Sequence, residues 1–196
     1  RDDGSGKPMA GDEQLGAVWR AAEALAAAGA SVEELEFPQL DGLRVLGSAI
    51  LGVEAAAFHL PWLRTRLDDY GEFMRQRVLS NFAYGPGAFV LAQQARAALR
   101  REAQNLLGRA DVLLLPIHPG PVPARGVPAV NGLAIPFNAL GWPALAMPAG
   151  LGADGLPLSV QLVAAPWAEA TLLRAAWSVE QALGTLAPPA YSTTSR

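Results

Sequence analysis

Apolar residues recur every three or four positions near the start of the chain. The residues that carry this spacing are Leu15, Val18, Ala22, Leu25 and Ala26. It is typical of an amphipathic helix and predicts one over 12–28, with Gly29 as its C-terminal cap. Apolar residues then alternate with acidic ones over 31–37 before Pro38, which predicts a short strand.

The pattern between residues 41 and 107 is helical, with breaks at proline and glycine. We expect a helix over 41–58, a new helical start at Pro61, and a long helix over 88–107. The stretch 45–63 is the most apolar of the chain, but Glu54 and His59 interrupt it. It therefore predicts a buried helix and not a membrane span.

Three continuous apolar runs in the second half predict buried strands. These runs cover 112–115, 143–147 and 158–163. A loop rich in proline and glycine, 116–132, separates the first two runs, and 150–155 has the turn residues of a hairpin. A helix over 167–183 follows, and 189–196 is a polar tail.

Helices that alternate with buried strands indicate an α/β fold, and the hairpin indicates a mixed sheet. We expect the three strands to be neighbours in one sheet, covered by the helix over 88–107 and by the last helix. The apolar strands and helix faces need a larger sheet to cover them than these three strands form. We therefore treat 1–196 as a single segment of a larger domain.

Composition narrows the function classes. Of 196 residues, 51% are hydrophobic and 17% charged, which excludes intrinsic disorder. The net charge of −3 argues against nucleic acid as a partner and against a basic membrane-binding surface. The chain has no cysteine, which excludes disulfides, and its two histidines provide few metal ligands. We therefore expect neither a metal nor a cofactor.

The usual catalytic patterns are missing. The chain has no GxSxG motif, and the spacing around Lys7 does not fit a phosphate-binding loop. Ser48 lies inside an apolar helical pattern and His59 at a helix end, so both are interpreted as structural residues. His118 follows a predicted strand, where ligands collect in α/β sheets, and is a candidate for substrate contact.

A series of short motifs from residue 111 onward carries a more specific signal. In chain order they comprise Asp111 with Pro116, Asn138 with Gly141 and Pro143, Pro148 with Gly150, and Gly155 with Pro157 and Gln161. Their order and spacing resemble the C-terminal part of amidase-signature enzymes. Glu54 and the long helix that bears Arg96 are compatible with the same resemblance.

The resemblance implies the C-terminal part of an α/β/α sandwich with a mixed central sheet. It also implies that the parent enzyme hydrolyses a carboxamide through a serine acyl-enzyme, and that its Ser-Ser-Lys residues lie in a segment upstream of Arg1. Lys7 is the sole lysine and has no glycine- and serine-rich neighbourhood, so we expect no catalytic residue within 1–196 and no activity of this chain alone.

The resemblance assigns to this segment the completion of the sheet and one side of the substrate pocket. The candidate binding residues are Phe137, Asn138, Trp142 and His118, because a few polar groups among apolar ones orient a substrate. Asn138 as a turn cap and Trp142 as a core residue are equally compatible with the sequence.

Two function classes remain open. The first is part of an amidase that acts on a small-molecule amide. The alternative is a non-catalytic module of the same fold that serves ligand binding or assembly. The chain starts with Arg1 and not with methionine, so we expect a fragment of a longer protein. We also expect that protein to be cytoplasmic. Weak net charge and abundant apolar residues also predict a homo-oligomer.

Overall fold

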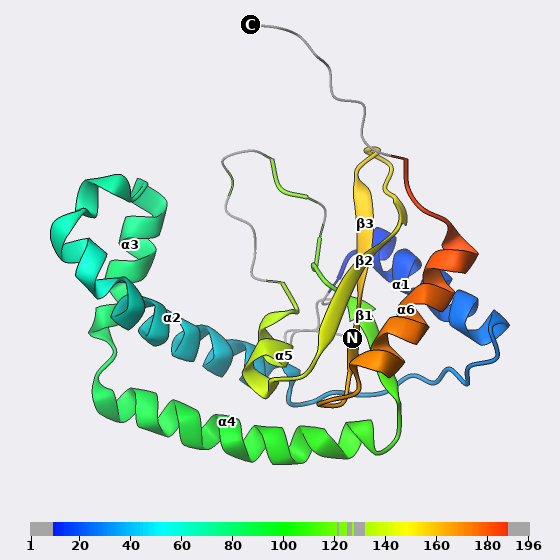
Figure 1. Cartoon of the computed structure of the whole chain (residues 1–196), viewed down its shortest axis with the longest axis horizontal. Coiled ribbons are helices and arrows are strands. Elements are labelled where there is room, and N and C mark those ends of the chain that lie inside the picture. Colours follow the sequence, from blue (N-terminus) through cyan, green and yellow to red (C-terminus); the bar gives the residue numbers. More distant parts are fainter. Residues whose placement is uncertain (1–9, 121, 125–126, 128–131, 188–196) are drawn as a thin grey trace, which may run out of the picture. The chain divides into compact units, whose positions relative to one another are not determined.

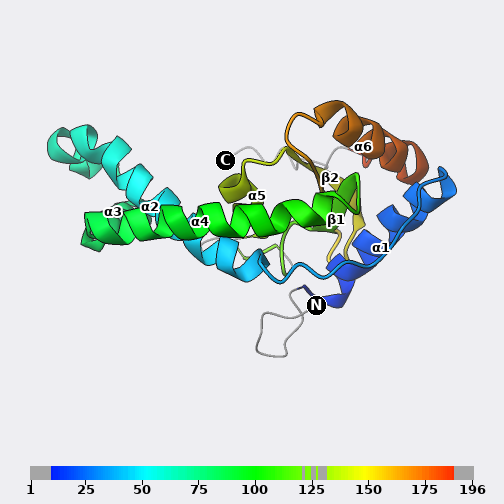
Figure 2. The ribbon, with the colours of Figure 1, turned by 90° about the horizontal axis from the view of Figure 1, so that it is seen from below.

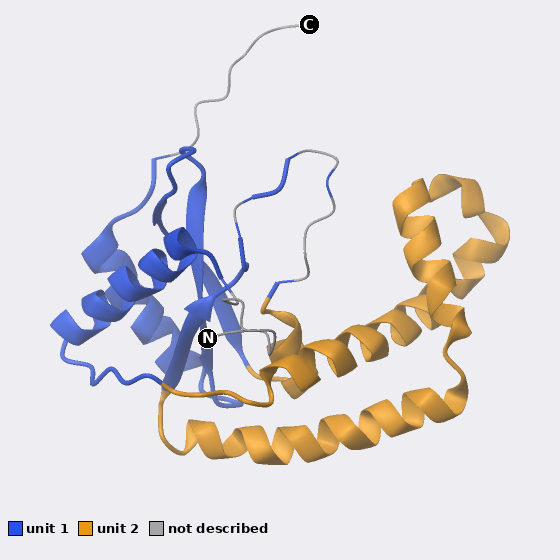
Figure 3. Ribbon diagram, turned by 180° about the vertical axis from the view of Figure 1, so that it is seen from behind, with its two compact units in different colours: residues 1–34, 112–132, 143–196 blue, residues 35–111, 133–142 orange. Residues whose placement is uncertain are grey.

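A computed structural model describes residues 10–120, 122–124, 127 and 132–187. The predicted tail 189–196 and Lys7 lie outside the described residues. The chain divides into two compact units that are interleaved in sequence (Figure 3). Unit 1 comprises Arg1–Glu34, Val112–Gly132 and Pro143–Arg196, and unit 2 comprises Leu35–Asp111 and Leu133–Trp142.

Unit 1 is built on a three-stranded antiparallel sheet. The strands are β1 (Val112–Pro116), β2 (Ala144–Leu151) and β3 (Pro157–Ala164), in the order β1-β3-β2. Leu114 pairs with Leu162 on one side of the central strand, and Leu145 pairs with the same residue on the other side. The three predicted strands are therefore neighbours in one sheet. All described pairings are antiparallel, so the mixed strand directions expected from the sequence are not found among these three strands.

Two helices cover this sheet in unit 1: α1 (Asp12–Ala27) and α6 (Glu169–Leu183), which pack on each other and on the strands (Figure 1). Alternate residues of β3 face them, as the period of two in a strand requires. The buried residues of this core are Ala17, Ala21, Ala149, Leu158, Val160, Leu162, Ala164, Leu172, Ala176 and Val179. The last helix covers the sheet as expected, whereas the long helix belongs to unit 2.

Side chains of α1 also hold the end of β2 and the turn that follows it. The Arg20 guanidinium donates to the carbonyl oxygen of Ala149 at 3.0 Å. The Glu13 carboxylate accepts from the backbone N–H of Ala153 at 2.8 Å. Gly150 has a φ of 119° and lies against Arg20, so a side chain there would be strained and crowded.

Unit 2 consists of helices. They are α2 (Leu40–Thr65), η1 (Leu67–Asp69), α3 (Glu72–Ser80), η2 (Asn81–Ala83), α4 (Pro86–Leu107) and α5 (Ile135–Leu140). Helix α2 packs against α4 and α5, and near its other end against α3 (Figure 2). Residues 31–37, predicted as a strand, form no strand here. Phe37 packs instead against the rings of Phe137 and Trp142, which explains the apolar end of the pattern.

Helix α2 differs from its prediction in two respects. It continues through Pro61 to Thr65, so Pro61 does not start a new helix. The proline lacks the N–H that would bond the carbonyl of Ala57, but Ala57 is exposed and water can satisfy that carbonyl. In addition, the helix is not buried on all sides. Leu43, Gly47 and Ile50 form one buried stripe, while Val45 and Phe58 are exposed. By length and apolar composition alone, α2 would qualify as a membrane-crossing helix.

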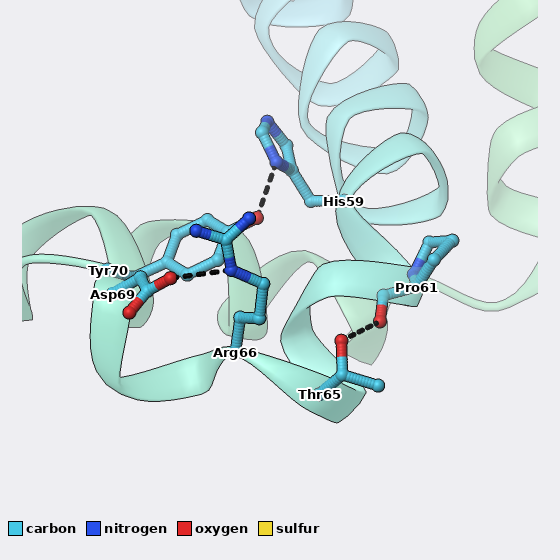
Figure 4. A network of polar contacts seen from close by, with 6 residues as sticks. All are labelled: His59, Pro61, Thr65, Arg66, Asp69 and Tyr70. Atoms are coloured by element: carbon cyan, nitrogen blue, oxygen red, sulfur yellow. Dashed lines mark hydrogen bonds and ion pairs between the residues drawn. The ribbon is translucent and has the colours of Figure 1, made fainter.

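A small polar network closes the end of α2 that adjoins α3 (Figure 4). His59 Nδ1 and the Tyr70 hydroxyl are 2.8 Å apart, and their rings meet edge to face. Thr65 Oγ1 donates to the carbonyl of Pro61 at 3.1 Å, and Arg66 donates to Asp69 at 2.6 Å. His59 therefore links α2 to the following turn, in accord with its interpretation as a structural residue.

Candidate functional site

The short helix α5 carries two of the four predicted binding residues, Phe137 and Asn138. Pro136 occupies its first turn, where a missing N–H costs nothing. Gly141 ends the helix in the left-handed region with a φ of 69°. The N–H of Gly141 bonds the carbonyl of Asn138 at 3.2 Å, and that of Trp142 bonds the carbonyl of Phe137 at 3.1 Å. This cap ends α5 and holds Trp142 next to the last turn of the helix.

Phe137 and Trp142 are core residues of unit 2. Their side chains are 0% and 5% exposed, and their ring centroids are 6.4 Å apart. Phe37 lies against both rings. The Trp142 Nε1–H is buried and has no hydrogen-bond partner within the described part of the chain. A role of these two rings in substrate binding stays a prediction.

Helix α5 lies unusually close to α2. An added Cβ at Gly47 would be 2.8 Å from Cγ2 of Ile135 and 3.1 Å from Cβ of Ala139. A glycine is therefore needed at this point of α2. Ser48, next to it, is half-buried and donates to the carbonyl of Arg44 at 2.8 Å, which supports its interpretation as a structural residue.

A hollow of about 120 Å³ lies in unit 2 where α2, α4 and α5 meet. Its lining residues are Gly47, Ile50, Leu51, Glu54, Arg96, Ile135, Asn138 and Ala139. Three polar side chains from three different helices thus line one hollow together with apolar ones. Such a mixture is typical of small-molecule sites, where few polar groups fix the orientation of a ligand.

The polar groups of the hollow have no polar partners among the described residues. Arg96 is half-buried, while Glu54 and Asn138 are exposed. In the described ranges, none of the three side chains forms a hydrogen bond or an ion pair. A cation, a carboxylate and an amide therefore line the hollow without a hydrogen bond or ion pair inside the described part of the chain.

The structure brings only part of the predicted site together. Asn138 lines the hollow, and Phe137 lies buried on the same helix. His118 belongs to unit 1, where it is exposed just beyond β1 and adjoins Gly132. Its contact with a substrate stays a prediction. Within the described residues, no three carboxylate or histidine side chains are placed to hold a metal.

Glu54 and Arg96 are the residues that sequence reasoning did not assign to the site. They are distant in sequence from Asn138, and only the packing of α2 and α4 around α5 brings them to one hollow. The available signal was a charged residue within the most apolar stretch of the chain, at Glu54.

Comparison with known proteins identifies the family. Residues 3–173 match the family model described as Amidase. The chain belongs to the amidase family. It is 29% identical over 216 aligned residues to a glutamyl-tRNA(Gln) amidotransferase subunit of Parvibaculum lavamentivorans, and the match covers 90% of this chain and 42% of that protein.

Solved structures agree with the family assignment. An amidase crystal structure matches this amidase-family chain with a TM-score of 0.79 and 29% identity, over 90% of this chain and 43% of that one. A chain of an inhibitor-bound vestigial complex, linked to the origins of an s-triazine catabolic enzyme, matches with a TM-score of 0.77 and 30% identity, over 89% and 40%. The chain thus spans less than half the length of these relatives, and its α/β fold is that of the family.

Proposed function

We propose that this chain is the C-terminal portion of an amidase that hydrolyses a carboxamide through a serine acyl-enzyme. The family match over residues 3–173 carries the proposal. Two further observations support it. The motifs around Asn138 resemble those of amidase-signature enzymes, and the chain spans less than half the length of each relative. The Ser-Ser-Lys residues of the reaction would lie in a segment upstream of Arg1.

The chemistry follows from the family resemblance. The serine oxygen attacks the carboxamide carbon and forms a tetrahedral adduct, whose C–N bond then breaks. The leaving ammonia or amine takes a proton, and water hydrolyses the resulting ester to the acid and free serine. This segment would complete the sheet and line the pocket through Phe137, Asn138, Trp142 and His118. Donors that face the developing oxyanion are supplied by the upstream segment.

A covalent probe tests the proposal. The complete gene product that contains this chain is expressed beside residues 1–196 alone, and both are treated with a fluorophosphonate. We expect the mass of one phosphonyl group on a serine of the longer protein, and turnover of a simple aryl amide that the label abolishes. Residues 1–196 alone should show neither effect.

Two results would contradict it. A longer product that is unlabelled and inactive would favour a non-catalytic module of the same fold. Aryl-amide turnover by residues 1–196 alone, abolished by a single Ser→Ala change, would show that the nucleophile lies within this chain.

A further inference from the structure

We propose that a groove between the C-terminal ends of α1 and α6 binds a guanidinium group, and that Arg174 of a second copy of this chain supplies it. Both helices belong to unit 1 and end on the same side of it (Figure 2). The groove has a volume of about 340 Å³. Its lining residues are Ala24, Ala27, Ala28, Trp177, Ser178, Gln181 and Ala182.

Backbone carbonyls without a donor belong to several of these lining residues. At the end of α1, the described residues donate backbone hydrogen bonds to the carbonyls of 24–26 but not to those of Ala27 and Ala28. At the end of α6, the N–H of Gly184 bonds the carbonyl of Glu180. The carbonyls of Gln181 and Ala182 receive no hydrogen bond from the described residues. The groove therefore suits a ligand that donates hydrogen bonds.

The electrostatics of the groove favour a cation. The C-terminus of a helix carries about half a negative charge, and two such ends meet here. The last turns of α1 and α6 contain no basic residue. Glu23 and Glu180 are exposed and adjoin lining residues in sequence, so they add negative charge. An anion would be repelled, and a neutral apolar side chain would cover the carbonyls without offering them a donor.

Trp177 makes a guanidinium more suitable than an ammonium. Its indole is exposed and lines the groove. A guanidinium is planar, so it can stack on the indole face while the N–H groups at its edge donate to carbonyl oxygens. An ammonium is a compact, strongly hydrated charge that cannot stack in this way. The groove therefore matches the side chain of an arginine.

Arg174 is the arginine that is placed to fill this groove in a second copy. In the described part of unit 1, the arginines are Arg20 and Arg174. Arg20 already donates to the carbonyl of Ala149. Arg174 is exposed and donates to Thr171 Oγ1 at 3.1 Å, and it forms no ion pair with the described residues. Its guanidinium can therefore turn toward a partner at little cost.

Arg174 and the groove lie on one face of α6, so this face is complementary to itself. Trp177, Ser178 and Gln181 follow Arg174 at the three-, four- and seven-residue spacing of one helix face. If two copies of α6 pack antiparallel about a two-fold axis at Trp177, Arg174 lies level with Glu180 of the partner subunit. Both arginines then reach a groove at once, as closed two-fold symmetry requires.

Sedimentation of residues 1–196 at micromolar concentrations tests the role of Arg174. Arg174→Gln should weaken the association about 25-fold, because the dimer holds two such contacts and an exposed charged contact contributes about fivefold. Arg100→Gln is the matched control, since Arg100 is exposed on α4 in unit 2 and does not line the groove. It should leave the association unchanged.

A reversal of both charges tests the contact itself. Ala27→Lys places an ammonium in the groove, and a basic residue suits the C-terminus of α1, so the fold should be kept. Arg174→Glu directs a carboxylate at the partner's carbonyls. Each change alone should weaken the association, whereas the two together should restore it, because the new carboxylate then meets the new ammonium. Ala97→Lys, at an exposed position of α4, controls for the added charge.

The outcomes decide this inference independently of the amidase proposal. Restored association of the doubly changed chain supports it. A chain that stays monomeric, a dimer that Arg174→Gln leaves unchanged, or two weakening changes that do not rescue each other would overturn it. Labelling of the longer gene product by the fluorophosphonate still decides the amidase proposal, since none of these variants alters a residue proposed to line the substrate pocket.

Discussion

At the scale of single residues, Gly47 allows α5 to approach α2. We predict that Gly47→Ala lowers the free energy of unfolding by about 1–3 kcal/mol, because the new methyl overlaps the Ile135 side chain in a packed contact. Gly16→Ala is the control. Its Cβ would meet only the flexible end of Arg20 at 3.5 Å, and alanine should add up to about 1 kcal/mol through helix propensity. Urea titration of both variants measures the difference, and equal effects would contradict the close contact.

Phe137 and Trp142 allow a second test at this scale. We predict that Phe137→Ala costs about 3–5 kcal/mol of stability, because it empties a fully buried position. Trp142→Phe should cost about 1 kcal/mol or less, since the lost Nε1–H has no partner in the described chain. Thermal and urea unfolding compare the two variants. A cost of several kcal/mol for Trp142→Phe would reveal a hydrogen-bond acceptor for the indole.

At the scale of elements, β3 is the only described strand paired on both sides. We therefore predict that its amides exchange with solvent on the order of 100-fold more slowly than the outward amides of β1 and β2. Hydrogen exchange read by NMR measures this ratio. Equal protection in all three strands would mean that further chain covers the edges of the sheet.

The elements also show what the sequence can predict. Continuous apolar runs predicted β1 and β3, and helical spacing predicted α1, because each pattern directly reflects burial on a neighbour. Residues 31–37 carry an alternating pattern without a partner strand, so the pattern alone was misleading. Helix α5 was missed because six residues with Pro136 inside give no helical period.

The site was predictable to a smaller extent. The family motif indicated Asn138, which does line the hollow. Glu54 and Arg96 join it only through the tertiary packing of α2, α4 and α5, and nothing local in the sequence encodes that meeting. Pairing of helices distant in sequence depends on side-chain fit over the whole contact, which a single sequence does not show.

At the scale of the whole molecule, two features favour self-association: the outer edges of β1 and β2, which pair with no strand in the described part of the chain, and exposed apolar side chains. Trp167, Leu173 and Trp177 are 93%, 58% and 63% exposed in unit 1. With a net charge of only −3, repulsion between copies is weak. We predict a homodimer or a higher oligomer that buries more than about 1,000 Å².

Sedimentation at micromolar concentration measures the oligomeric state. Trp177→Glu is a suitable variant, because it places a charge on the exposed face of α6 without touching a core position. It should shift the equilibrium toward the monomer. A clean species of 20.5 kDa for the unchanged chain would contradict the prediction.

The strand order β1-β3-β2 also governs what happens while the protein is being made. Among the described residues, both outer strands hydrogen-bond to β3 alone, and β3 is the last of the three to be synthesised. The ribosome adds about 5–20 residues per second, and β3 begins about 40 residues after β1 ends, so β1 waits about 2–8 s for a partner. During that interval the apolar segment Val112–Pro116 lacks the strand that pairs with it in this sheet, and exposed apolar segments of this kind are what chaperones bind.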